Sequence, residues 1–159
     1  MKIEKLKENS LDEIISFVSN NKNLVIENNN IFTNDFKNLL LRFASSRNKV
    51  SSELLCYALR DENRELNSAI VFNFKGEISV FCLKDLTNFD TGKELLERLK
   101  EVIDINKIPE LFAKASDEHI GDFNRIGFKS VRFYSTMDDA NTYSNYYFLL
   151  RYRFNNVSE

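Results

Sequence analysis

The sequence of 159 residues is poor in histidine and cysteine: it contains one histidine, His119, and two cysteines, Cys56 and Cys82. A histidine-based zinc site or a hydrolase triad has almost nothing to build on with a single imidazole. Both cysteines lie within apolar runs and have no Cys or His neighbour at metal-ligand spacing. We therefore expect free, buried thiols in a reducing compartment, and no metal site.

An excess of positive charge and long apolar runs are also missing. The net charge is −2 and the isoelectric point is near 5.6, whereas a general nucleic-acid binder needs a basic face. No run approaches the ~20 apolar residues of a membrane span, and the charged start "MKIEKLKENS" lacks an apolar signal region. No repeat or proline-rich linker divides the chain. We expect a single cytoplasmic domain over residues 1–159 that binds neither nucleic acid nor membranes.

Hydrophobic periodicity predicts a mixture of strands and helices. Strands are expected at residues 1–7, 52–61, 65–74, 75–85, 110–116, 129–138 and 144–154. Helices are expected at residues 10–21, 33–47 and 117–128, and along the apolar stripe of Leu95, Leu96, Leu99, Val102 and Ile103. Residues 52–85 are typical of a three-stranded antiparallel meander, and Gly127 of a left-handed helix cap. The order predicts an α/β (α+β) fold with a mixed, mainly antiparallel sheet of six to seven strands flanked by helices.

The stretch "LTNFDTGKELLERL", residues 86–99, begins one of these helices. Thr91 and Glu94 have the spacing of a capping box, in which each side chain bonds the backbone amide of the other residue. Alternatively, the N–H groups of the helix start around Gly92 hold a phosphate. Asp90 opposes this, because a pyrophosphate about 4 Å from its carboxylate would be repelled by on the order of 4 kcal/mol. The sequence leaves both interpretations open.

The order of elements and two motifs resemble the GNAT superfamily of acyl-CoA N-acyltransferases, over nearly the whole chain. That family's third helix opens with Arg/Gln-x-x-Gly-x-Gly/Ala, which falls here on Thr87, Asp90 and Gly92. A second family stretch, Ala-Ile-x-x-Tyr-x-x-x-Gly-Phe, is similar to "HIGDFNRIGF", where Ile120, Gly127 and Phe128 match. The family's tyrosine, which often protonates the departing CoA thiolate, is replaced by Phe123.

The resemblance implies an N-acyltransferase that uses acetyl-CoA and in which the amine attacks the thioester directly. It implies that the backbone of Phe81, Cys82 and Leu83 holds the pantetheine arm. It also implies a pyrophosphate site at Thr87, Thr91, Gly92 and Lys93, with Ser116, Phe123 and Arg125 lining the cofactor. In the absence of the family tyrosine, the candidates for the catalytic acid or base are Tyr134, Tyr143 and His119.

Two alternatives accompany this reading. In one, the fold has lost its cofactor and serves as a binding or regulatory module, which Asp90, Thr87 and Phe123 favour. In the other, the enzyme takes its acyl group from a carrier-bound donor. The acceptor expected for the enzyme is a small-molecule or peptide amine. The C-terminal "YSNYYFLLRYRF" is rich in Tyr, Phe and Arg, a composition that suits a homodimer interface as well as a strand packed in a sheet.

Overall fold

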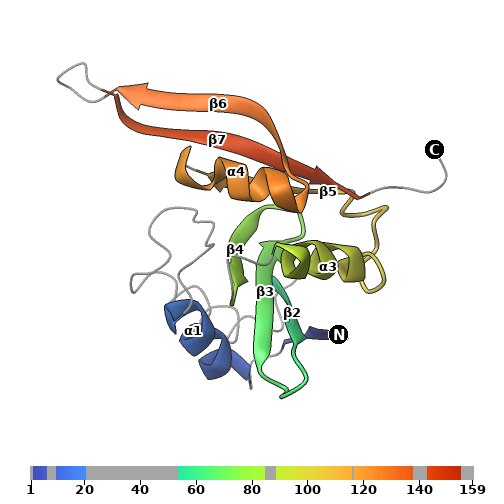
Figure 1. The fold of residues 1–159 in the computed structure, drawn as a ribbon. Helices are drawn as coiled ribbons and strands as arrows, with labels where there is room; N and C mark the ends of the chain where they lie inside the picture. The colour runs from blue at the N-terminus through green and yellow to red at the C-terminus, as the bar shows by residue number, and fades with distance from the viewer. Residues whose placement is uncertain are drawn as a thin grey trace.

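The computed structural model describes residues 2–6, 10–20, 54–84, 89–115, 117–137 and 143–154. In these residues the strands form two antiparallel sheets (Figure 1). The first has the order β1-β2-β3-β4, with β1 at Ile3–Lys5, β2 at Leu54–Arg60, β3 at Leu66–Asn73 and β4 at Ile78–Leu83. The second has the order β5-β7-β6, with β5 at Glu110–Ala115, β6 at Lys129–Met137 and β7 at Tyr143–Arg153.

Within the described ranges, three helices cover these sheets: α1 at Leu11–Asn20, α3 at Asp90–Leu99 and α4 at Asp117–Ile126. The predicted mixed fold and its meander of β2, β3 and β4 are confirmed. The helix predicted at residues 33–47 lies outside the described residues. None of the helices in the described ranges has both the length and the apolar content that a membrane span requires.

The first sheet is buried on both faces. Along β3, Ile70 and Phe72 point into a core shared with α3 and α4, whereas the alternating Ala69 and Val71 point into a second core beneath α1. Burial on both faces explains why these strands are continuous apolar runs instead of an alternating pattern. Cys56 and Cys82 are thiols that are fully buried in the α1 core, as the sequence predicts.

Glycine ends α4 as predicted. Gly127 has a φ of +125°, a value that side chains with a Cβ rarely adopt. Its N–H donates to the carbonyl oxygen of Phe123 at 3.1 Å, and the N–H of Phe128 donates to the same oxygen at 2.9 Å. This reversal directs the chain from α4 straight into β6, which then pairs with β7.

The predicted limits of α3 are wrong at both ends. The helix begins at Asp90 after an N-cap residue, Phe89, that makes no side-chain capping bond, so the predicted Thr91 capping box does not form. Thr91 is instead inside the helix and 7% exposed, because its side chain packs with the helix face that covers the sheet. At the other end the helix stops at Leu99, and 3₁₀-type bonds such as Val102 N–H to Leu99 O replace the predicted last turn.

Arg60 ties α1 to the sheet. From the end of β2 it donates to the carboxylate of Glu4 on β1 at 2.7 Å and to both carboxylate oxygens of Glu13 on α1 at 2.7 and 2.8 Å. It also donates to the carbonyl oxygen of Arg64 at 2.9 Å. The hydrogen bonds from Arg60 hold the pKa of Glu13 below its usual value.

Replacing Arg60 with alanine is expected to lower the free energy of unfolding by about 1–2 kcal/mol at pH 7. Because the folded-state pKa of Glu13 is lowered, its contribution is present above the unfolded-state pKa and is lost as the pH falls through the folded value. The difference between parent and variant should therefore shrink below about pH 4. Urea unfolding at several pH values measures this. Arg98→Ala is the control: it breaks only the exposed Arg98–Glu101 pair, so a loss as large as that of Arg60→Ala would contradict the account.

Candidate functional site

The two sheets meet at one point and then separate. In the described part of the chain, β4 and β5 are joined by a single parallel bridge between Glu77 and Phe112. The N–H of Phe112 donates to the carbonyl oxygen of Gly76 at 2.7 Å. Gly76 lies in the turn before β4 with a φ of +83°, and a Cβ there would overlap the carbonyl oxygen of Glu110. Beyond this contact β4 runs down the first sheet while β5 stays with the second (Figure 1).

The separation leaves backbone groups of β4 facing the diverging strand. The N–H of Lys84 donates to the carbonyl oxygen of Asn67, on the β3 side, at 2.9 Å. Backbone direction alternates along a strand, so Cys82 also turns its N–H and C=O toward β3, while Phe81 and Leu83 turn theirs toward β5. On the facing strand, β5, the N–H of Phe112 points at Gly76, and the same alternation turns the backbone of Lys114 toward β4. Of the three predicted pantetheine contacts, two have the required backbone direction.

The start of α3 lies at the C-terminal end of β4. The first intrahelical bond runs from the N–H of Lys93 to the carbonyl oxygen of Phe89 at 3.1 Å. The N–H groups of Asp90, Thr91 and Gly92 therefore precede the helical ladder, and the N-cap residue Phe89 makes no side-chain capping bond to them. Such an end attracts anions through its N–H groups and its partial positive charge.

Gly92 has a packing role in this first turn. A Cβ at this position would lie 3.1 Å from Cδ1 of Ile126 on α4 and 3.5 Å from Cδ1 of Leu83 on β4. Gly92 thus lets α3, α4 and β4 approach closely at the place where the N–H groups of α3 emerge. The sequence predicts a role for Gly92 in phosphate binding, and the structure adds a role in packing these elements together.

Charged side chains of both signs lie at the start of α3. The guanidinium carbon of Arg125, an exposed residue of α4, lies 5.1 Å from the ring centroid of Phe89. This cation–π contact holds a positive charge beside the helix N-terminus. Asp90, the first residue of the helix, is exposed, as is Lys93 one turn along. The charges near a bound anion would therefore include one repulsive carboxylate.

Phe123 supports the β4 wall. Its ring is fully buried and meets the ring of Phe81 edge-on with centroids 6.1 Å apart. It also packs against Phe128 at 5.3 Å. The side chain that replaces the family's tyrosine therefore touches a residue whose backbone faces β5.

For the remaining predicted residues the structure describes at most the backbone. Thr87 and Ser116 lie outside the described residues. The backbone of His119 lies in the first turn of α4, Tyr134 pairs with Tyr147, and Tyr143 pairs with Met137 near the far end of the β6–β7 hairpin.

Thiol and metal chemistry find no support at this site. Burial raises the pKa of the Cys82 thiol to about 12, so it carries almost no thiolate at neutral pH and is no nucleophile. The pKa of the Cys56 thiol is raised to about 12 for the same reason. In the residues that the structure describes, no three His, Cys, Asp or Glu side chains are grouped as metal ligands.

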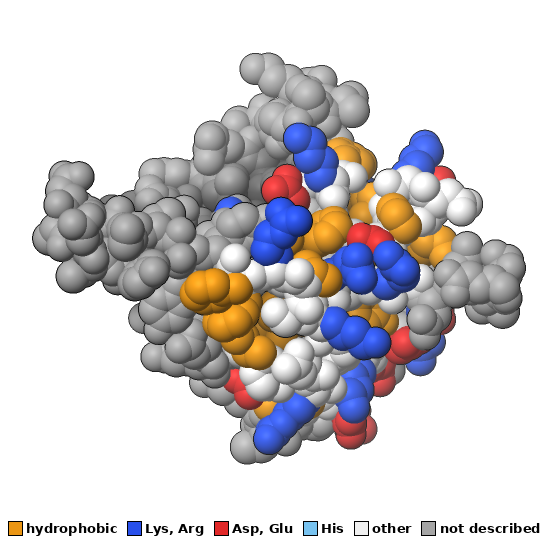
Figure 2. Space-filling model, turned by 90° about the horizontal axis from the view of Figure 1, so that it is seen from above, with side chains coloured by type: hydrophobic (Ala, Val, Ile, Leu, Met, Phe, Trp, Pro, Cys, Tyr) orange, Lys and Arg blue, Asp and Glu red, His pale blue; other side chains and the backbone are white. Residues whose placement is uncertain are grey.

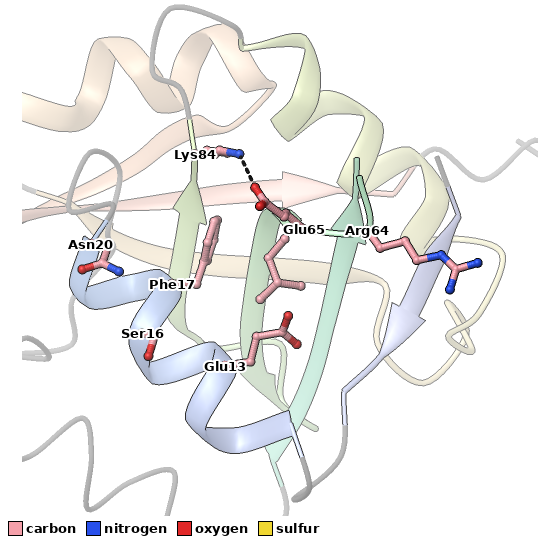
Figure 3. Close-up of a pocket in the computed structure, with 8 residues that line it drawn as sticks. Glu13, Ser16, Phe17, Asn20, Arg64, Glu65 and Lys84 are labelled. Carbon is pink, nitrogen blue, oxygen red and sulfur yellow. Dashed lines mark hydrogen bonds and ion pairs between the residues drawn. The ribbon is translucent and has the colours of Figure 1, made fainter. Parts of the chain in front are cut away.

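A pocket of about 260 Å³ opens on the other side of the first sheet, between α1 and the start of β3 (Figure 3). Its carboxylates are paired: Glu65 lies 3.1 Å from Lys84, and Glu13 accepts hydrogen bonds from Arg60, which lies outside the lining. The side chain of Arg64 points away from the pocket (Figure 3). The lining is Glu13, Ser16, Phe17, Asn20, Arg64, Glu65, Leu66 and Lys84. With its carboxylates paired, this pocket offers no defined charge to a ligand.

Sequence reasoning missed three parts of the site. Phe89, which positions Arg125, shows no recognisable signal because an aromatic residue before a helix is unremarkable. Lys114 enters through its backbone, which sequence patterns do not report. The role of Gly76 depends on its contact with Phe112, which joins segments whose proximity depends on the sheet arrangement.

Similarity to known proteins is visible in structure but not in sequence. No protein-family model matches the chain, and no curated protein sequence matches it. Among solved structures, an N-acetyltransferase from Staphylococcus aureus Mu50 superposes with a TM-score of 0.67 at 15% identity, over 96% of each chain. A spermidine N-acetyltransferase variant from Vibrio cholerae gives a TM-score of 0.65 at 11% identity, covering 96% of this chain and 95% of that one. A ribosomal-protein-alanine N-acetyltransferase from Brucella melitensis gives 0.60 at 14%, covering 97% and 100%.

Proposed function

We propose that this chain, which has the fold of the GNAT N-acetyltransferases, transfers an acetyl group from acetyl-CoA to an amine. The observation that carries the proposal is that two sets of backbone groups follow one another along the chain. The backbone groups of Phe81 and Leu83 face the strand that has separated from β4, and the next element of the described chain, α3, begins after an N-cap residue, Phe89, that makes no side-chain capping bond. Together they offer hydrogen bonds to an extended amide-containing arm that ends in phosphates.

The residues of the chain fit the parts of this cofactor. The backbone of Phe81 and Leu83 would pair with the pantetheine amides as an added strand would. The N–H groups of Thr91 and Gly92, together with the Arg125 guanidinium, would meet the pyrophosphate. The cofactor supplies an acetyl group on a thioester, an activated acyl donor.

The reaction also requires two proton transfers. The amine nitrogen forms a bond to the carbonyl carbon and loses a proton, while the carbon–sulfur bond breaks and the leaving sulfur gains one. Phe123 has no proton to give, so the leaving sulfur is expected to draw its proton from water or from a group other than this ring. Because Phe123 cannot act as this acid, slow turnover is expected.

A thiol-release assay tests the activity. Purified protein is incubated with acetyl-CoA and a panel of amines that includes polyamines and peptides with a free N-terminus, and free CoA is followed with a thiol reagent. Amine-dependent release above the rate of hydrolysis is the expected result. No release with any amine, together with no binding of acetyl-CoA, would favour the second candidate.

That second candidate is a binding module that has lost the cofactor, and it rests on Asp90. The carboxylate stands at the helix end that would meet the pyrophosphate, and its repulsion competes with an attraction of only about 0.3–1 kcal/mol from the helix. The two candidates therefore differ in whether acetyl-CoA binds at all, and the charge of Asp90 is the variable that connects them.

Replacing Asp90 with asparagine is expected to tighten acetyl-CoA binding about fivefold, since removing one exposed, solvent-screened carboxylate near the pyrophosphate relieves on the order of 1 kcal/mol of repulsion. Calorimetric titration at low and high salt measures the change, which should diminish as salt increases. Asp104→Asn makes the same charge change beyond the other end of α3, where the side chain accepts a hydrogen bond from the N–H of Asn106. Equal effects of both substitutions would indicate a general charge effect and contradict a phosphate site at Asp90.

A further inference from the structure

The outer face of the second sheet, the one turned away from α4, carries all the charged residues of its three strands. Strand register places Glu110 beside Arg153, Lys129 beside Arg151, and Lys114 and Arg132 on either side of Leu149. The intervening residues Leu111, Ala113 and Leu150 face inward to the core. We call the outer set the basic face; it consists of Glu110, Phe112, Lys114, Lys129, Arg132, Leu149, Arg151 and Arg153.

This face is strongly positive on a protein whose net charge is negative. Its five cationic side chains stand against one carboxylate, which leaves four positive charges in excess, whereas the whole chain has a net charge of −2. The one carboxylate, that of Glu110, is held by Arg153 at 2.7 Å. Figure 2 views the molecule from this side and shows Lys and Arg side chains gathered over the sheet.

The arrangement works against the stability of the sheet. Lys129 and Arg151 are directly opposite each other on neighbouring strands, and like charges in such positions are destabilising. Phe112 is the cross-strand neighbour of Arg151 on its other side and is only partly buried. A row of cation, cation and aromatic across three strands is therefore better explained by a ligand than by folding.

The dimensions of the face limit what that ligand is. Neighbouring strands lie about 4.8 Å apart and alternate residues about 6.7 Å apart, so three strands and three rows span roughly 10 by 13 Å. This area matches a short acidic peptide segment in extended conformation. A long nucleic acid would extend past the face onto a molecule that is otherwise negative, beyond the ~8 Å over which salt screens charges at physiological ionic strength.

We propose that the basic face docks an acidic segment of a polypeptide acceptor. The inference rests on the proposed acyl transfer, since β5 belongs to both features: the backbone of Lys114 faces β4, and its side chain lies on the basic face. An acidic segment lying across β5, β7 and β6 would be anchored by the cations and would pack against Phe112 and Leu149. Its amine would then be delivered from β5 toward the separation between β4 and β5.

Fluorescence anisotropy with a labelled peptide of alternating glutamate and serine tests the docking without requiring acyl transfer. The parent should bind this peptide at low salt and more weakly as the salt concentration increases. It should not bind the same peptide with glutamine in place of glutamate. Lys129→Glu should weaken binding at least tenfold. Because this substitution turns a like-charge pair with Arg151 into an opposite-charge pair, its melting temperature should equal or exceed that of the parent. Unfolding therefore cannot account for the loss.

Lys5→Glu is the matched control, because it makes the same charge change on β1, at the far edge of the first sheet. Equal loss of binding in both variants would overturn the proposal, as would equal binding of the glutamine peptide. Tighter binding of a single-stranded RNA than of the acidic peptide would assign the face to nucleic acid instead. Titration with acetyl-CoA distinguishes the two proposals. If Lys129→Glu still binds acetyl-CoA but no longer binds the peptide, the substitution affects docking alone. If the protein binds the peptide but not acetyl-CoA, only the proposed acyl transfer is overturned.

Discussion

Replacing Gly76 with alanine is expected to lower the free energy of unfolding by roughly 3 kcal/mol or more. Two costs add. The φ of +83° costs a residue with a Cβ about 1–2 kcal/mol, and the Cβ would overlap the carbonyl oxygen of Glu110, a backbone atom that cannot rotate away. Relief of that overlap must move β4 and β5 apart at the bond between Phe112 N–H and Gly76 O. Chemical denaturation measures the loss, and weaker acetyl-CoA binding should accompany it.

Gly121→Ala is the control for this prediction. Gly121 lies on an exposed face of α4, and a Cβ there would meet no atom within 4 Å. Because alanine favours helix over glycine, this variant should be more stable than the parent by about 0.5–1 kcal/mol. If Gly76→Ala were as stable as Gly121→Ala, the joint between the two sheets would not depend on the glycine, and the account of their separation would be wrong.

Replacing Phe123 with tyrosine is expected to raise the rate of acyl transfer roughly tenfold to a hundredfold, at the lower end of what a general acid contributes. The ring is held by Phe81 and Phe128, so the added hydroxyl should extend the existing ring without changing its direction. Burial raises the pKa of Tyr152 to about 12 in the same core, so a phenol at position 123 should also stay protonated at neutral pH. It would be able to donate a proton to the leaving sulfur.

Two measurements distinguish catalysis from packing in this variant. The pH profile should gain a decline in rate at high pH, displaced above the usual phenol pKa of about 10 because burial in this core disfavours the phenolate. Phe133→Tyr makes the same chemical change at a residue of β6 that is 53% exposed, and it should leave the rate unchanged. A rate for Phe123→Tyr equal to or below that of the parent would indicate that the leaving sulfur does not lie near this ring.

The local structure was predictable from the sequence where the signal is local. The meander of β2, β3 and β4 follows from apolar runs separated by turn residues, and the α4 end follows from Gly127. The predicted capping box does not form because the helix begins at Asp90, one residue earlier than expected. Thr91 therefore lies inside the helix, on its packed face. Local motif strength does not decide such a competition when tertiary burial is involved.

The features that define the site depend on distant contacts. The separation of β4 from β5 follows from one bridge between Glu77 and Phe112, segments on either side of α3. The basic face needs the register of three strands to bring Lys129 beside Arg151. The low net charge, read from the sequence as evidence against a basic surface, is an average that hides this concentration of positive charge.

Isothermal titration calorimetry with acetyl-CoA tests the central claim most directly, that the separation between β4 and β5 together with the start of α3 forms a cofactor site. The account predicts one acetyl-CoA per chain, with micromolar affinity in the parent and tighter binding in Asp90→Asn. Heats indistinguishable from dilution for both proteins would contradict it, because the start of α3 and the outward backbone of Phe81 and Leu83 would then bind no acyl-CoA.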